Sequence, residues 1–122
     1  MSDPPLIVIV DDDIMVCEAT QDLVETFGFG VRTFTSANDF LKSDCVLGTS
    51  CLIADVQMRG TSGLQLHRRL IASGLRIPVI FITAFPNERV RKQALSAGAV
   101  CYLSKPYDPN DLLGCIRSGL RS

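Results

Sequence analysis

Five apolar runs of strand length, separated by segments with helical periodicity, set the strongest limit on how this chain folds. In chain order, the runs are Leu6–Val10, Val31–Thr35, Cys51–Ala54, Pro78–Ile82 and Val100–Leu103. Three of them, LIVIV, CLIA and PVIFI, are almost continuously apolar and rich in branched residues, which is typical of strands buried on both faces of a parallel sheet. The other two, VRTFT and VCYL, are shorter or more mixed, as we expect of edge strands.

The segments between these runs predict helices that pack on the sheet. In the first segment, one helical face carries the apolar residues Val16, Ala19, Leu23 and Phe27. Ser36 and Asp108 stand at N-cap positions of the second and fifth helices. Because strand and helix alternate five times, the pattern predicts a doubly wound α/β sandwich.

Size and charge limit the function. The 122 residues suit one domain, and the formal net charge is -1 with no basic stripe. This argues against direct nucleic-acid binding by the chain. The early apolar run Leu6–Val10 is too short for a membrane span or a signal peptide, so we expect a cytoplasmic protein that does not enter a membrane.

The cysteines and the single histidine give no sign of a metal site. The five cysteines contain no CxxC pair and are odd in number; they are Cys17, Cys45, Cys51, Cys101 and Cys115. We expect buried free thiols that act as small apolar residues, rather than disulfides. His67 has no ligand partner at helical spacing, so we expect it on a solvated helix face.

Polar residues stand at the ends of four predicted strands. In chain order, they are Asp11, Asp12 and Asp13, then Asp55, then Thr83, and finally Ser104 and Lys105. Ligands of open α/β sheets bind beyond the carboxyl ends of the strands, so the fold should gather these groups in one place. Asp13 suits a helix start, because acids favour helix N-termini, and we leave it out of the site.

The gathered groups suit metal-assisted phosphoryl chemistry. Crowded carboxylates repel one another unless a cation or a proton intervenes, and hard oxygen ligands suit Mg²⁺. The lysine ammonium and the threonine hydroxyl suit the oxygens of a transferring phosphoryl group. One carboxylate then remains as the nucleophile, and the strand pattern does not say which one.

Four motifs stand in order at the ends of the predicted strands: IVDDD, IADVQMRGTSG, FITAF and YLSKPY. With them, the chain resembles receiver domains of bacterial response regulators along essentially its whole length. The segments RTFTSANDFL and SAGAVCYLSKPY are similar to receivers of nitrogen-fixation-type transcriptional regulators. The resemblance implies a flavodoxin-like five-stranded parallel sheet, in strand order 2-1-3-4-5, with five helices.

The resemblance also implies roles for individual residues. Asp55 would be the phospho-acceptor, and Thr83 and Lys105 would be phosphoryl ligands, with a cis bond between Lys105 and Pro106. The implied magnesium site consists of the acidic pair Asp11 and Asp12, together with Asp55 and the backbone carbonyl of Gln57. The chain departs from the family pattern at Arg59, where proline is usual, and at Tyr107, where phenylalanine is commoner.

We therefore expect residues 1–122 to form a receiver domain that takes its phosphoryl group from a histidine kinase. It would be a signalling domain that assists its own phosphorylation and dephosphorylation, rather than an enzyme. For Tyr102, plain packing and a switch role that follows Thr83 remain open. The face formed by the fourth helix, fifth strand and fifth helix would contact a partner or a second copy. Similar receivers usually precede a helix-turn-helix output domain, which would lie outside this chain.

Two other classes fit less well. A magnesium-dependent phosphohydrolase with an aspartyl-phosphate intermediate needs a second acid near its nucleophile, and Gln57 at that spacing cannot serve. Such an enzyme also needs a covering cap, for which the chain is too short. A flavodoxin-like cofactor carrier needs a hydroxyl- and glycine-rich loop after the first strand, where three acids would repel a phosphate.

Overall fold

The computed structural model describes residues 3–121, which contain a five-stranded parallel sheet. The strands are β1 (Leu6–Val10), β2 (Gly30–Phe34), β3 (Cys51–Asp55), β4 (Val79–Thr83) and β5 (Cys101–Ser104). Their order across the sheet is β2-β1-β3-β4-β5, so the predicted order is confirmed. The mixed runs form the edge strands β2 and β5, and the three apolar runs form the buried centre.

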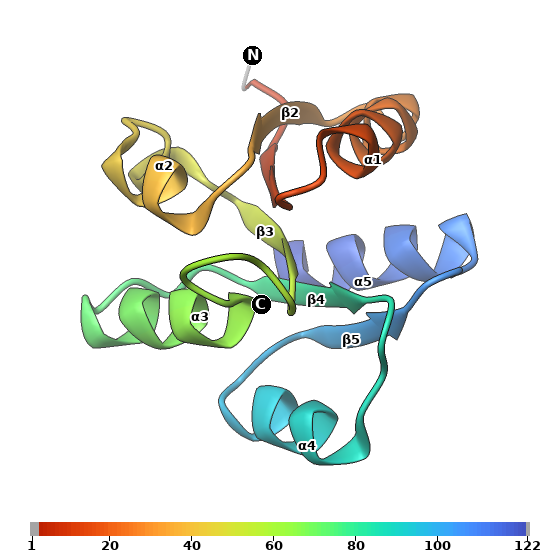
Figure 1. The fold of residues 1–122 in the computed structure, drawn as a ribbon. Helices are drawn as coiled ribbons and strands as arrows, with labels where there is room; N and C mark the ends of the chain where they lie inside the picture. Colours follow the sequence, from red (N-terminus) through yellow and green to blue (C-terminus); the bar gives the residue numbers. More distant parts are fainter. Residues whose placement is uncertain (1–2, 122) are drawn as a thin grey trace.

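Helices cover both faces of this sheet (Figure 1). They are α1 (Ile14–Thr26), α2 (Ala37–Lys42), α3 (Gly63–Ala72), α4 (Glu88–Ser96) and α5 (Pro109–Arg121), with a short 3-10 helix η1 (Val46–Gly48). Helices α1 and α5 lie on one face, and α2, α3 and α4 lie on the other. The predicted caps are present, because the Ser36 hydroxyl accepts from the Asp39 N–H and the Asp108 carboxylate accepts from the Asn110 N–H. Within the described part of the chain, none of the helices has the length and apolar character that crossing a bilayer requires.

The central strands bury side chains on both faces, which explains their continuous apolar sequence. In β1, Ile7 and Ile9 pack toward α1 and α5, whereas Val8 and Val10 pack toward α2, α3 and α4. Burying one such side chain stabilises the fold by about 1.5–3 kcal/mol. Both hydrophobic layers therefore depend on the same three strands, and these strands hold the polar residues at their ends in a fixed position.

The buried face of α1 differs from the prediction. Its fully buried residues are Cys17, Thr20 and Val24, whereas Ala19 is exposed. The Cys17 thiol donates a hydrogen bond to the Asp11 carbonyl at 3.2 Å. Cys17, Thr20 and Val24 thus form the centre of the contact, and the predicted Leu23 and Phe27 lie at its margin, partly buried against the same layer.

Two of the five cysteines form a disulfide, which corrects the prediction that all of them are free. Cys101 in β5 and Cys115 in α5 are bonded, with Cα atoms 6.1 Å apart. That separation is ordinary for a disulfide. The remaining cysteines, Cys17, Cys45 and Cys51, are free and buried as expected. The pairing arises from the packing of α5 on β5, which no local cysteine spacing reveals.

His67 is buried, so the prediction of a solvated position was wrong. Its side chain lies on the inner face of α3 and is only 5% exposed. The ring meets Phe81 of β4 edge-on, with centroids 5.6 Å apart. Its Nδ1 has no hydrogen-bond partner among residues 3–121. Burial lowers the pKa of His67 below its usual 6.5, because charging the ring there would remove an ion from water.

His67 should make stability depend on pH. The unfolded chain binds a proton at His67 near pH 6.5 while the folded protein resists it, so this stability is present above pH 6.5 and lost as pH falls. We expect His67→Phe to lose less free energy of unfolding than the parent between pH 7.5 and 5.5, measured by urea denaturation. The other titrating groups are the same in both proteins, so their contribution to the pH dependence cancels in the difference between the two free energies of unfolding. Equal losses in both proteins would contradict a neutral buried His67.

Candidate functional site

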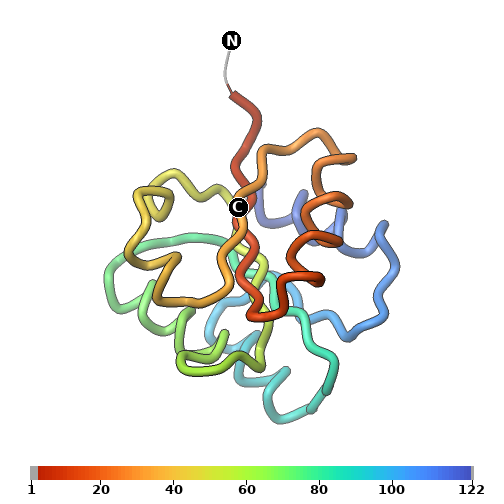
Figure 2. The backbone as a smooth tube through the Cα atoms, turned by 45° about the horizontal axis from the view of Figure 1, so that its top comes forward, coloured from red at the N-terminus to blue at the C-terminus, as the bar shows by residue number. Residues whose placement is uncertain are grey.

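The polar residues predicted at the strand ends meet at one edge of the sheet. The parallel register pairs Val10 of β1 with Ala54 of β3, and Thr83 of β4 with Ser104 of β5. Each strand therefore ends at nearly the same level, and the next residues of the chain enter a shared space. In Figure 2, β1 runs away from the N-terminus, and the chain turns back into α1 at that edge.

Three carboxylates form the centre of the site. One oxygen from each of Asp11, Asp12 and Asp55 lies within 4.8 Å of the others. Asp11 is buried at 4% exposure, Asp12 is exposed, and Asp55 is partly buried at the end of β3. A donor set made only of carboxylate oxygens suits a hard divalent cation, and these three residues could hold a metal ion.

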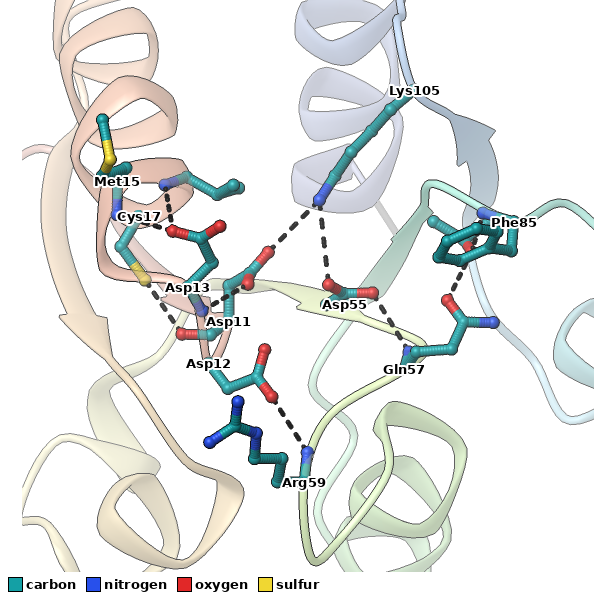
Figure 3. A network of polar contacts seen from close by, with 12 residues as sticks. Asp11, Asp12, Asp13, Met15, Cys17, Asp55, Gln57, Arg59, Phe85 and Lys105 are labelled. Carbon is teal, nitrogen blue, oxygen red and sulfur yellow. Dashed lines mark hydrogen bonds and ion pairs between the residues drawn. The ribbon is translucent and has the colours of Figure 1, made fainter.

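Lys105 faces this acid cluster from the end of β5, as Figure 3 shows. Its ammonium lies 3.4 Å from an Asp11 carboxylate oxygen and 3.7 Å from an Asp55 carboxylate oxygen. Its backbone N–H donates to the Thr83 carbonyl at 2.8 Å, which holds the residue beside β4. The Lys105–Pro106 peptide bond is cis, as the resemblance implied.

Asp55 resists ionisation in this setting. Burial and the charge of Asp11 raise its pKa, while Lys105 and the Gln57 N–H lower it. The raising effects win, and the pKa of Asp55 increases from 3.8 to about 6. A cation beside these carboxylates would favour the ionised form, which is the form that can act as a nucleophile.

Gln57 contributes a side-chain contact that the sequence did not predict. The Thr83 hydroxyl, which is fully buried, donates to the Gln57 side-chain oxygen at 2.6 Å and accepts from the Phe85 N–H at 3.0 Å. The Gln57 N–H in turn donates to an Asp55 carboxylate oxygen at 3.0 Å. Gln57 therefore links Asp55 to Thr83, and no local sequence signal indicates this link.

Arg59, where the family pattern has proline, tethers the loop after β3 to the acid cluster. Its backbone N–H donates to an Asp12 carboxylate oxygen at 3.0 Å (Figure 3). Proline has no N–H and could not make this bond. The departure from the family pattern thus adds a fixed partner for one of the three carboxylates.

Two other residues that the sequence analysis considered do not join the cluster. Asp13 caps α1, because its carboxylate accepts from the N–H groups of Met15 and Val16, as expected of a helix start. Tyr102 lies on β5, and its hydroxyl accepts from the Asn87 N–H at 3.2 Å, where α4 begins. This contact connects β5 to the segment that follows Thr83.

Asp55→Asn should reveal the strain in the acid cluster. The raised pKa of Asp55 means that its contribution to stability is fully present below pH 3.8 and lost as pH rises through about 6. In metal-free buffer at pH 7.5, the variant should be more stable than the parent by on the order of 2–3 kcal/mol, and near pH 4 the gap should vanish. Denaturation at both pH values measures the gap.

The exposed cap residue offers a matched control for this change. Asp13→Asn makes the same substitution outside the cluster and keeps a side chain that can cap α1. Unlike Asp55→Asn, it should gain no stability over the parent as pH rises. If Asp55→Asn also gains no stability over the parent as pH rises, the crowding of these carboxylates does not destabilise the folded protein.

Known proteins resemble this chain in sequence and in structure. The family model of the response regulator receiver domain matches residues 7–117. The response regulator protein TmoT of Ectopseudomonas mendocina is 42% identical over 116 residues, which cover 95% of this chain and 53% of that protein. The transcriptional regulatory protein FixJ of Azorhizobium caulinodans is 35% identical over 112 residues, covering 92% of this chain and 53% of FixJ. The chain thus spans about half the length of the curated relatives it matches.

Solved structures of response regulators also superpose on this chain. The response regulator StyR superposes with a TM-score of 0.89 at 37% identity, covering 97% of this chain and 60% of that one. The structure titled FixJ-N gives a TM-score of 0.87 at 28% identity, covering 99% and 96%. The likeness to FixJ confirms the predicted similarity to nitrogen-fixation-type regulators. The chain therefore belongs to the family of response regulator receiver domains.

Proposed function

We propose that residues 1–122 act in the cytoplasm as a phosphorylation-driven switch that accepts a phosphoryl group on Asp55 from a histidine kinase. One observation carries the proposal: the Asp55 carboxylate at the end of the central strand β3 lies beside the acids that follow β1, and the Lys105 ammonium that follows β5 lies 3.7 Å from it. A phosphoryl group on Asp55 would have both the metal ligands and a positive charge next to it.

Asp55 suits the role of nucleophile better than its two neighbours. Asp11 is almost fully buried, and its two carboxylate oxygens contact the Asp13 N–H and Lys105. Asp12 lies on the side of Arg59, away from β4 and β5. Asp55 pairs in register with Ile82, so Thr83 is one residue beyond it on the neighbouring strand. Only from Asp55 would the phosphoryl group reach both Thr83 and Lys105.

Magnesium would be held by Asp11, Asp12, Asp55 and the Gln57 backbone carbonyl. The bound cation would neutralise charge on the oxygens of the transferring group. An Asp55 oxygen attacks phosphorus as the bond to the donor histidine breaks, so one P–O bond replaces one P–N bond. The Lys105 ammonium pairs with a phosphoryl oxygen, and the Thr83 hydroxyl donates a hydrogen bond to another.

The Gln57–Thr83 contact supplies a physical basis for the switch. The Thr83 hydroxyl has one proton, and in this structure it donates that proton to Gln57. Donating it to a phosphoryl group instead would break the Gln57 contact and draw Thr83 toward Asp55. The loop after Thr83 ends at Asn87, and the Asn87 N–H donates a hydrogen bond to the Tyr102 hydroxyl. A movement of this loop would therefore displace Tyr102 and β5.

We infer that α4, β5 and α5 together form the face that reports phosphorylation. This switch face would contact a partner, a second copy of the chain or a helix-turn-helix output domain of a longer protein. Tyr102 would change its contacts there because its hydroxyl already partners the N-terminus of α4. The domain would assist its own phosphorylation and dephosphorylation, with signalling as its purpose.

Phosphorylation should be confined to Asp55. Treatment with acetyl phosphate and magnesium should add one phosphoryl group to the parent and to Asp13→Asn, measured by intact mass, and none to Asp55→Asn. Chelation of magnesium should abolish the adduct in the parent. An adduct of full intensity in Asp55→Asn would show that another residue is the acceptor.

Thr83 should couple phosphorylation to the switch face. Thr83→Ala should still accept a phosphoryl group, more slowly, but should lose the phosphorylation-dependent change in hydrogen exchange over residues 90–103. Thr83→Ser keeps the hydroxyl and should retain that change. If Thr83→Ala responds like the parent, the hydroxyl does not carry the signal.

A further inference from the structure

The disulfide lies inside the proposed switch face. Cys101 is the first residue of β5, directly before Tyr102, and Cys115 lies in the middle of α5. The bond therefore joins two of the three elements whose movement would report phosphorylation. It also lies on the opposite side of the sheet from α4, among the residues that pack α5 against β3 and β4.

Of the two bonded cysteines, Cys101 is the more exposed. It is partly exposed, whereas Cys17, Cys45, Cys51 and Cys115 are buried. Burial raises the pKa of the Cys51 thiol to about 12, so that thiol stays protonated and unreactive. We therefore expect a small thiolate to attack the Cys101 sulfur. The protonated Cys51 thiol would not compete with it as a nucleophile.

We propose that the Cys101–Cys115 bond is a reversible redox modification site, opened by small thiols and closed by small disulfides. A thiolate RS⁻ attacks the Cys101 sulfur, the protein S–S bond breaks, and Cys115 leaves as a thiolate that takes a proton. A second thiol then releases RSSR and leaves Cys101 as a thiol. Overall, two RSH are oxidised to RSSR and one protein disulfide is reduced to two thiols, and oxidation by RSSR is the reverse.

The bond should oppose the phosphorylated state; this step rests on the proposed function. A covalent link holds the start of β5 against α5, while the phosphoryl group would draw Thr83 inward and shift β5 through Tyr102. If disulfide formation and phosphorylation favour different arrangements of this face, each makes the other less favourable, by the same free energy. The reduced protein should therefore accept a phosphoryl group more readily than the oxidised one.

The test compares the whole chain in its two redox states. After incubation with oxidised glutathione, alkylation of the denatured protein should label the three free cysteines, and after dithiothreitol it should label all five. With limiting acetyl phosphate and magnesium, the steady-state ratio of phosphorylated to unphosphorylated chain should be at least about fivefold higher in the reduced protein. Hydrogen exchange over residues 101–121, measured without phosphodonor, should also be faster in the reduced state.

Variants separate this bond from other effects of the reagents. Cys101→Ser should label its four remaining cysteines in either reagent and should be phosphorylated to the extent of the reduced parent in both, whereas Cys45→Ser, which changes a free buried cysteine, should keep the difference between the two reagents. Five labelled cysteines after oxidised glutathione would overturn the redox proposal. Measurable phosphorylation to the same extent in both states would overturn the coupling of the bond to phosphorylation. If neither state is phosphorylated while the label count and the exchange rates still change, the phospho-acceptor function is wrong and the redox site stands.

Discussion

Lys105 holds together a group of charges that would otherwise repel one another. Its ammonium lies against both Asp11 and Asp55, while Asp12 completes the cluster. At about 4 Å and an effective dielectric constant of about 20, each pair of unit charges interacts by about 4 kcal/mol. Three ionised carboxylates and one ammonium leave two uncompensated negative charges. The raised pKa of Asp55 follows from this imbalance, as does the suitability of the cluster for a divalent cation.

The cluster exists because the sheet is parallel and its strands end in register. Side chains from β1, β3, β4 and β5 reach the same edge only if the central strands are fixed by burial on both faces. The two hydrophobic layers therefore serve the site as well as stability. A charge cluster of this kind costs free energy, and the packing of the strands offsets that cost.

Hydrogen bonds join the site to the surface where a response could be read. From Asp55 the path runs through Gln57 to Thr83, along the following loop to Asn87, and across to Tyr102. Each of the three hydrogen bonds in this path has one defined donor and one acceptor. The disulfide then ties the strand that holds Tyr102 to α5, so the end of this path is covalently restrained.

The amino-acid sequence by itself determined the number, type and order of the strands and helices, because long apolar runs and their periodicity are local features. It also determined which residues follow each strand, so the membership of the acid cluster, Thr83 and Lys105 was predictable. At the level of the sequence, the choice of Asp55 as the proposed acceptor came from the motifs of a family, because the strand pattern does not distinguish the carboxylates.

The tertiary structure alone decided which side chains meet across elements. The Cys101–Cys115 bond, the burial of His67 against Phe81 and the rotation of α1 about its axis all depend on how helices dock on the sheet. The contact of the Gln57 side chain with Thr83 joins residues 26 positions apart. Such contacts are absent from local patterns, because they result from packing between surfaces that the chain brings together only when it folds.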